Sequence, residues 1–291
     1  MRCFVAGMMT HPALVHVVLG RELSGRAKEL PGFVLRQQGQ SGSVLMAETG
    51  ARAAGLVVDL SQAEAARLVA MRVRAASRLR AVSAPAEVRH RAVPGDVVVA
   101  EGRLPYARFF AVEEYEVSWR RFDGDMSSSA TRAAFVSRDK VTVLPYDPRR
   151  DLLLVVERFR AGPLARGAGQ CWQIEAIAGR IDPGETPEAA ARREAVEEAD
   201  LRLDRLISVA NYYPTPGAVS EYIYSYGALT DLPDGSAGVF ELEGEAEEIR
   251  GHLISFEQLM GLVVSGEVEN APLILTALWL QRERGRLRSA A

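Results

Sequence analysis

The chain has 291 residues, of which 48% are hydrophobic and 25% are charged, and these are ordinary values for globular proteins. Its formal net charge of −3 provides no overall basic field, which argues against nucleic acid or anionic membrane as a partner. Two cysteines form neither a disulfide framework nor a metal-binding pattern, and no segment reaches the roughly 18 apolar residues of a membrane span. We therefore expect a soluble cytoplasmic protein that is long enough for two domains.

The first hundred residues predict a small α+β unit. A strand is expected over residues 2–9, followed by a helix over residues 11–21 with Thr10 as its N-cap. Ser61 is expected to cap a second helix over residues 62–73. Between the helices lie three short strand-like runs separated by Gly-containing turns, at 30–35, 43–48 and 54–60.

Residues 81–105 contain Pro, Gly and Ala between short apolar stretches, which predicts a domain boundary near residue 100, within about ten residues. The chain beyond it is first rich in strands and then helical. Residues 232–248 indicate an acidic, Gly-containing loop. The expected strands lie within 108–119, 133–147, 151–160, 221–230 and 248–256, and the expected helices within 256–266 and 270–285.

The most informative segment begins at Gly179. Five residues separate it from Glu185, and seven more separate Glu185 from the pair Arg193–Glu194. Thr186 suits an N-cap and Pro187 suits the first helical position, so a loop is expected to lead into a helix over about 187–199.

Three carboxylates on this helix, Glu194, Glu197 and Glu198, are three and four residues apart and are expected on one face. A bare cluster of this kind would repel itself, whereas Mg²⁺ prefers oxygen ligands and shares its coordination sphere with water and phosphate. The backbone carbonyl of Ala178 can add a further ligand. Together these residues predict a site in which divalent cations neutralise a diphosphate and activate water.

A solvated helix explains the EAVEEA run taken alone, but not the glycine, Glu185 and Arg193 at fixed offsets. Arg193 is expected to point away from the carboxylates and to pair with Glu185. The complete pattern, G-x5-E-x7-R-E-U-x-E-E-x-G-U with U apolar, resembles that of the Nudix hydrolases, with Asp200 in place of the last glycine. Asp tolerates the left-handed conformation better than most residues. The resemblance implies three metal ligands, Glu194, Glu197 and Glu198.

Segments outside this pattern resemble the ADP-ribose pyrophosphatase branch over about residues 108–285. The resemblance implies hydrolysis of ADP-ribose to AMP and ribose 5-phosphate, with Mg²⁺ or Mn²⁺ as cofactor. It also implies a homodimer, because residues 108–135 match an element that crosses to the partner. The matching segments are ERFR at 157–160, CWQIEAIAGRID at 171–182, the Tyr-Pro-x-Pro-Gly turn at 213–217, EGEAEEIRGHLIS at 243–255 and SGEVENAPLILTALWLQ at 265–281.

Several flanking residues make chemical sense in such a site. Arg160 can clamp a diphosphate, or form an ordinary surface ion pair. Glu175 can accept from a ribose hydroxyl, or face solvent on a strand. Trp119 and Phe122 can stack on an adenine, although such residues more often belong to a core.

The acidic loop is expected to carry the general base. Glu245 and Glu247 match the two acidic positions of this loop in the branch, and the sequence does not choose between them. A loop of this kind can bring a base to a metal-bound water as it closes. The predicted catalytic residues are therefore Glu245 and Glu247, together with Glu198 on the helix.

The start of the chain, CFVAGMMTHPALVHVVLGR followed by ELPGFVLR, resembles the γ-glutamylcyclotransferase-like (AIG2-like) fold. Arg72 stands where that family has its catalytic acid, so residues 1–100 are expected to form an inactive, β-barrel-like domain. Residues 101–291 are expected to form a Nudix α/β/α sandwich with a mixed sheet. The fusion resembles bacterial proteins associated with tellurite resistance. The family's opening motif is degenerate here at Ala6, Met8 and Met9.

Three alternatives remain open. The enzyme can hydrolyse another nucleotide sugar such as GDP-mannose, because the motif recognises only the diphosphate and metals. It can be a non-catalytic nucleotide-sugar-binding module, which the intact carboxylates argue against. It can be a cyclotransferase with an accessory Nudix domain, which Arg72 argues against.

Overall fold

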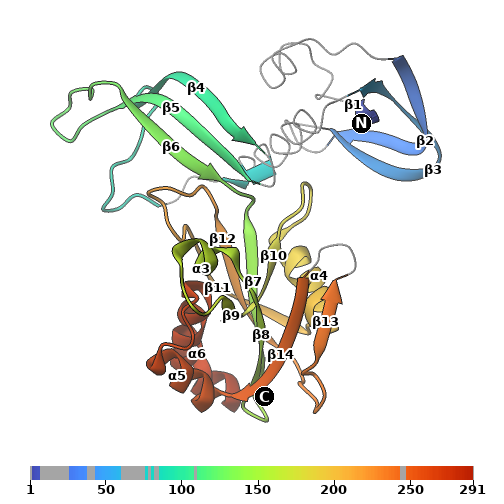
Figure 1. Ribbon diagram of the computed structural model, residues 1–291, viewed down its shortest axis with the longest axis vertical. Helices are drawn as coiled ribbons and strands as arrows, with labels where there is room; N and C mark the ends of the chain where they lie inside the picture. Colours follow the sequence, from blue (N-terminus) through green and yellow to red (C-terminus); the bar gives the residue numbers. More distant parts are fainter. Residues whose placement is uncertain are drawn as a thin grey trace. The chain divides into compact units, whose positions relative to one another are not determined.

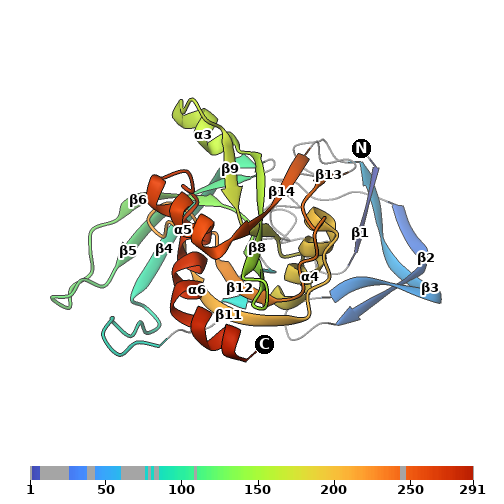
Figure 2. The ribbon, with the colours of Figure 1, turned by 90° about the horizontal axis from the view of Figure 1, so that it is seen from below.

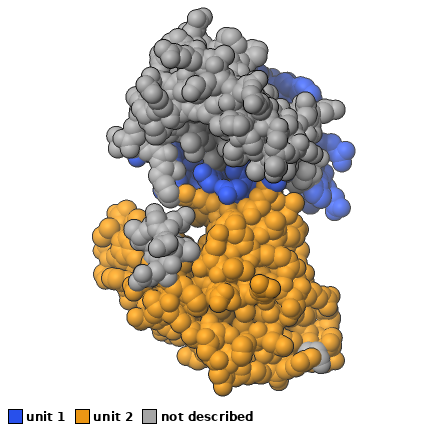
Figure 3. Space-filling view, turned by 90° about the vertical axis from the view of Figure 1, so that its right-hand side faces the viewer, with its two compact units in different colours: residues 1–138, 182–184, 217–220 blue, residues 139–181, 185–216, 221–291 orange. Residues whose placement is uncertain are grey.

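The computed structural model describes residues 2–6, 26–37, 43–59, 76–77, 80–81, 85–107, 110–242 and 247–290 (Figure 1). The chain divides into two compact units, which are coloured separately in Figure 3. The domain boundary near residue 100 stays a prediction. The first unit contains residues 1–138, 182–184 and 217–220, and the second contains residues 139–181, 185–216 and 221–291.

The first unit begins with an antiparallel sheet of β1 (Arg2–Ala6), β2 (Arg26–Gln37) and β3 (Ser43–Asp59), in the order β1-β3-β2. The expected strand at the N-terminus is confirmed. The prediction of separate strands at 43–48 and 54–60 is wrong, because β3 is one strand that pairs with β2 on both sides of a register shift. The helices expected over 11–21 and 62–73, with their caps, and Arg72 lie outside the described residues.

A second sheet of the first unit comprises β4 (Val97–Ala107), β5 (Ala111–Trp119) and β6 (Ala130–Val136). Both pairings are antiparallel, with β5 in the middle. This sheet accounts for the strand-rich character expected of the region around residues 108–135.

The second unit is built on an eight-stranded sheet, and the predicted mixed character of this sheet is confirmed. Strand β12 runs parallel to β7, whereas the other pairings are antiparallel. Neither β11 nor β13 was expected, and β13 lies inside the stretch predicted to be an acidic loop. The main path runs β11 (Arg205–Tyr212), β12 (Ile223–Leu229), β7 (Lys140–Asp147), β8 (Leu152–Phe159), β14 (Glu247–Ser255) and β13 (Val239–Leu242).

The middle of this sheet contains a fork. Strands β7 and β8 pair at their turn, where Tyr146 faces Leu153, and then separate. Into the gap between them run β9 (Trp172–Glu175), which pairs with β8, and β10 (Ile177–Arg180), which pairs with β7. The fork therefore places residues 175–179 in the centre of the unit.

Helices cover both faces of the sheet (Figures 1 and 2). One hydrophobic cluster joins α4 (Pro187–Ala199) to β7, β8 and β12, and the other joins α5 (Phe256–Ser265) and α6 (Ala271–Ser289) to the opposite side chains of the same strands. The expected layered α/β/α arrangement is confirmed for this unit. None of the described helices is long and apolar enough to cross a membrane.

Gly227 on β12 permits the close approach of α6. A Cβ atom at this position would lie 2.7 Å from Cζ3 and 2.9 Å from Cη2 of Trp279, which are atoms of a rigid ring. We expect Gly227→Ala to lower the free energy of unfolding by about 1–3 kcal/mol, because overpacking forces the ring or the helix to shift. Urea unfolding measures this cost. In a Trp279→Leu background the same change should cost much less, and an equal cost would contradict the packing explanation.

Candidate active site

Helix α4 spans the residues predicted for it. Thr186 is extended and its hydroxyl accepts from the Ala189 N–H at 3.2 Å, while Pro187 occupies the first turn. The helix ends at Asp200, which adopts the left-handed conformation with φ 46° and ψ 36°, and its N–H reaches the carbonyls of Ala195 and Val196. Asp200 thus takes the role of the glycine that it replaces in the motif.

The left-handed conformation of Asp200 makes a paired prediction possible. Asp200→Gly should raise the free energy of unfolding by about 0.5–1 kcal/mol, because glycine has no Cβ to be strained there. Asp200→Ala should lower it by a similar amount. Urea unfolding of both variants tests the pair, and a glycine variant that is less stable than the alanine variant would contradict the explanation.

Gly179 lies directly beneath the carboxyl group of Glu194. A Cβ atom at Gly179 would lie 1.7 Å from the carboxyl carbon and 1.8 Å from Oε1 of Glu194. The glycine of the motif is therefore needed for this carboxylate to lie against β10. Glu194 is buried, and burial, partly opposed by Arg193, raises the pKa of its carboxyl.

The guanidinium of Arg193 forms hydrogen bonds with three carboxylates. It donates to Glu185 at 3.0 and 3.1 Å, which confirms the pairing expected between the loop and the helix. It also donates to Glu194 at 2.7 Å and to Glu197 at 2.8 Å, so the expectation that it points away from the metal-facing residues is wrong. A further bond to the carbonyl of Arg180 at 2.8 Å ties the helix to β10.

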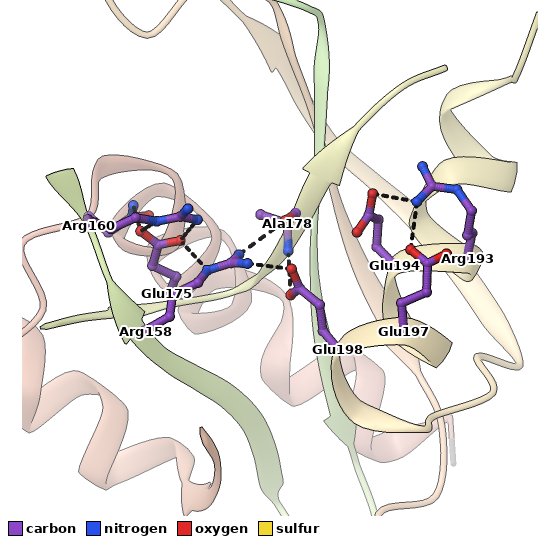
Figure 4. A network of polar contacts seen from close by, with 9 residues as sticks. Arg158, Arg160, Glu175, Ala178, Arg193, Glu194, Glu197 and Glu198 are labelled. Carbon is purple, nitrogen blue, oxygen red and sulfur yellow. Dashed lines mark hydrogen bonds and ion pairs between the residues drawn. The ribbon is translucent and has the colours of Figure 1, made fainter. Parts of the chain in front are cut away.

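Glu198 reaches from α4 toward Arg158 and Ala178, away from Arg193 (Figure 4). One of its oxygens accepts from the backbone N–H of Ala178 at 3.2 Å, and the other accepts from Arg158 on β8. Only 2% of Glu198 is exposed. Burial raises the pKa of its carboxyl to about 7, although Arg158 acts in the opposite direction.

Arg160, the residue directly after β8, forms a bidentate pair with Glu175 on β9, with N–O distances of 3.0 and 2.7 Å. Asn270, the N-cap of α6, also donates to Glu175 at 3.3 Å. Glu175 is buried, which rules out the alternative that it faces solvent. Burial alone would raise the pKa of Glu175, but the hydrogen bonds and charge of Arg160, together with the charges of Arg158 and Lys140, outweigh burial and hold this pKa below its usual value.

The donors along β10 suit a hard cation. The Glu194 carboxylate lies against Gly179, and the Glu198 carboxylate and the Ala178 carbonyl lie beside the preceding residue. These oxygens accept hydrogen bonds from Arg193, from Arg158 and from the Ala178 N–H. Glu197 is more exposed and bonds to Arg193. Among the described residues no group of three His, Cys, Asp or Glu side chains converges on one point. Carboxylate and carbonyl oxygens are the ligands that Mg²⁺ prefers, so these donors fit the ion by their chemistry.

One of the two predicted bases, Glu247, lies in a described strand. Strand β13 ends at Leu242, and Glu247 is the first residue of β14, with Leu242 opposite it in the register. Glu245 lies outside the described residues. The expectation of one continuous loop over 232–248 is thus corrected, because its middle pairs with β14.

Trp119 and Phe122 belong to the first unit. The guanidinium of Arg132 lies 5.0 Å from the centre of the Trp119 ring, whereas Phe122 is fully exposed. Phe122 is therefore not a core residue. Stacking of either ring on an adenine stays a prediction.

Two contributors to the site were not predicted, Arg158 and Asn270. The strand alternation in ERFR contained a signal for Arg158, because residues two apart on a strand project to the same face, here with Arg160. Glu175, the site partner of Asn270, lies 95 residues away in the chain, and no local pattern indicates this contact.

Comparison with known proteins decides the family. The NUDIX domain model matches residues 136–275. An ADP-ribose pyrophosphatase of Escherichia coli (strain K12) is 33% identical over 194 residues, which are 67% of this chain and 92% of that protein. The chain belongs to the Nudix family. The predicted Nudix resemblance and the prediction of a hydrolase are thereby confirmed.

Two further matches have lower sequence identity. A GDP-mannose pyrophosphatase of Yersinia pestis (strain Pestoides F) is 26% identical over 173 residues, which are 60% of this chain and 85% of that protein. A solved structure described as an ADP compounds hydrolase covers 66% of this chain and 98% of its own, with 18% identity and a TM-score of 0.49. The Nudix model does not reach the first 135 residues, so the γ-glutamylcyclotransferase-like resemblance and the tellurite association stay predictions.

Proposed function

We propose that this Nudix hydrolase cleaves the diphosphate of ADP-ribose, giving AMP and ribose 5-phosphate. The observation that carries the proposal is the close grouping, at the fork, of oxygen donors for a cation and of a guanidinium for a phosphate. Glu198 and Ala178 supply the oxygens, and Arg160, aligned by Glu175, supplies the guanidinium. The ADP-ribose pyrophosphatase relative, of which the chain covers nearly the whole length, supports this substrate.

Glu194, Glu198 and the Ala178 carbonyl would hold Mg²⁺, with Mn²⁺ as the second choice, and Glu197 would join them after release from Arg193. When bound, the metal neutralises the diphosphate and lowers the pKa of a water. Loss of activity in a chelator, with recovery on adding Mg²⁺, tests this requirement.

The protein's own groups bind, orient and move one proton. Arg160 would bind the diphosphate by charge-assisted hydrogen bonds, with Glu175 orienting it rather than bonding the ribose directly. Hydrolysis forms a bond from the water oxygen to one phosphorus, breaks the bridging P–O bond and transfers the water proton to a carboxylate. We assign that carboxylate to Glu245 or Glu247, and Glu→Gln variants of each distinguish them: the larger fall in kcat identifies the base.

A panel of nucleotide sugars with Mg²⁺ tests the substrate. ADP-ribose should show the highest kcat/KM. GDP-mannose is the second candidate, because the alignment with the GDP-mannose pyrophosphatase covers most of that protein. Chromatography that detects AMP and ribose 5-phosphate as products shows that the diphosphate is the group cleaved. If ADP-ribose ranked among the poorest substrates, the proposed substrate would be wrong while the reaction class would stand.

Two further proposals concern the whole chain. We propose a homodimer that uses the strand-rich region around residues 108–135, and light scattering of the full chain tests it against a monomer. We also propose that the N-terminal part lacks cyclotransferase activity, because Arg72 cannot act as a base. Formation of 5-oxoproline from γ-glutamyl peptides would contradict this.

A further inference from the structure

Arg158 lies between the oxygens of Glu198 and Ala178 on one side and the Arg160–Glu175 pair on the other (Figure 4). Only 3% of it is exposed. Its Nη1 donates to Oε1 of Glu198, its Nη2 donates to the Ala178 carbonyl at 3.1 Å, and its Nε donates to Glu175 at 3.3 Å. One guanidinium therefore joins β8, β9, β10 and α4.

Two of these partners are the oxygens proposed to hold the metal. The Glu198 carboxylate and the Ala178 carbonyl can ligate a metal cation. In this structure both oxygens instead accept hydrogen bonds from the positively charged guanidinium of Arg158. A buried ion is tolerated when it is paired and hydrogen-bonded. When Glu198 and Glu175 are both ionised, Arg158 and Arg160 balance their two negative charges without any added ion.

A divalent cation that binds these oxygens meets two costs. It must take the place of the guanidinium at Glu198 and at Ala178, and it must then lie beside a positive charge that stays buried. We expect Arg158 to keep its bond to Glu175 during this exchange, because Glu175 pairs with Arg160 and is not one of the oxygens proposed to hold the metal. Arg158 is thus a competitor of the metal that remains anchored next to it.

We infer that Arg158 is a positioning residue that weakens the affinity of the free protein for divalent metal by occupying Glu198 and the Ala178 carbonyl. This inference rests on the proposed metal site. It differs from a merely structural role, because removal of a structural ion pair leaves metal affinity unchanged or lowers it, whereas removal of a competitor raises it.

Mg²⁺ titration of the full chain by calorimetry, after treatment with a chelator, tests the inference. Arg158→Gln should bind Mg²⁺ about tenfold more tightly than the wild type, which lies within the usual range of coupling between sites. It should also gain more in melting temperature from added Mg²⁺. The matched control is Arg192→Gln, which removes an arginine that bonds backbone carbonyls of Leu203 and Asp204 and should leave Mg²⁺ affinity unchanged.

The possible results distinguish the role of Arg158 from the proposed metal site. Equal or weaker Mg²⁺ binding by Arg158→Gln, with normal binding by the wild type, overturns the role of Arg158 alone. No Mg²⁺ binding by either protein overturns the proposed metal site. If Arg158→Gln folds only with Mg²⁺, the competitor role is supported, because the metal then replaces the missing charge. Arg158→Lys, a point charge that cannot bridge three partners, should show a smaller gain in affinity of the same sign.

Discussion

Replacement of Glu198 with Gln is expected to lower the rate of ADP-ribose hydrolysis by roughly a thousandfold, because groups that stabilise developing charge are each worth up to about that much. The amide keeps the shape of the side chain and can still accept from Arg158, but it has no charge to offer a cation. The protein should remain folded, with a free energy of unfolding lowered by about 1–3 kcal/mol, because the bond from Arg158 no longer joins two opposite charges. AMP release and urea unfolding measure the two effects.

The matched control for Glu198→Gln is Glu283→Gln on α6, where the carboxylate bonds to Arg282 and Arg286 at the surface. This variant should retain the activity of the wild type. If Glu198→Gln kept activity within a few-fold of the wild type, Glu198 would be removed from the metal site. A variant that lost both activity and cooperative unfolding would instead assign Glu198 a structural role.

Gly179→Ala is expected to lower activity by roughly a hundredfold with little effect on stability. The new Cβ would overlap all three carboxyl atoms of Glu194, and the flexible end of that side chain can move aside. The backbone then stays in place while one proposed ligand is displaced by an ångström or more, a shift that can cost about a hundredfold in rate. The change in free energy of unfolding should stay near 1 kcal/mol or below.

Gly261→Ala is the control for this substitution, because a Cβ atom there meets nothing within 4 Å on helix α5. It should leave activity unchanged and raise the free energy of unfolding by about 0.5–1 kcal/mol, as alanine favours a helix more than glycine does. Wild-type activity in Gly179→Ala would show that the position of Glu194 against β10 is not required for turnover.

Helix α4 shows what sequence alone can predict here. Thr186, Pro187 and the alternation of alanines with charged residues act within a few positions of one another, so both ends of the helix were predicted correctly. The contact of Arg193 with Glu185 was predicted for the same reason, since the motif places both on one loop–helix unit.

Long-range pairing explains the errors. Residues 43–59 form one strand because β2 pairs along its length, which no local turn signal reveals. Strand β13 is short and exists because β14 offers it an edge. The contacts of Arg158 join residues up to 40 positions apart, and only the fold brings these carboxylates to it.

The fork between β7 and β8 has a consequence for the motions of the enzyme. The segment that carries Glu175 and Ala178 is hydrogen-bonded to β8 on one side and to β7 on the other. Residues 172–175 pair with β8 and residues 177–180 pair with β7, and both ladders lie inside the sheet. We therefore expect the amides bonded in these ladders to exchange among the slowest in the second unit. The backbone that faces the proposed metal site is then rigid. Any movement that closes over a substrate must come from segments outside the fork.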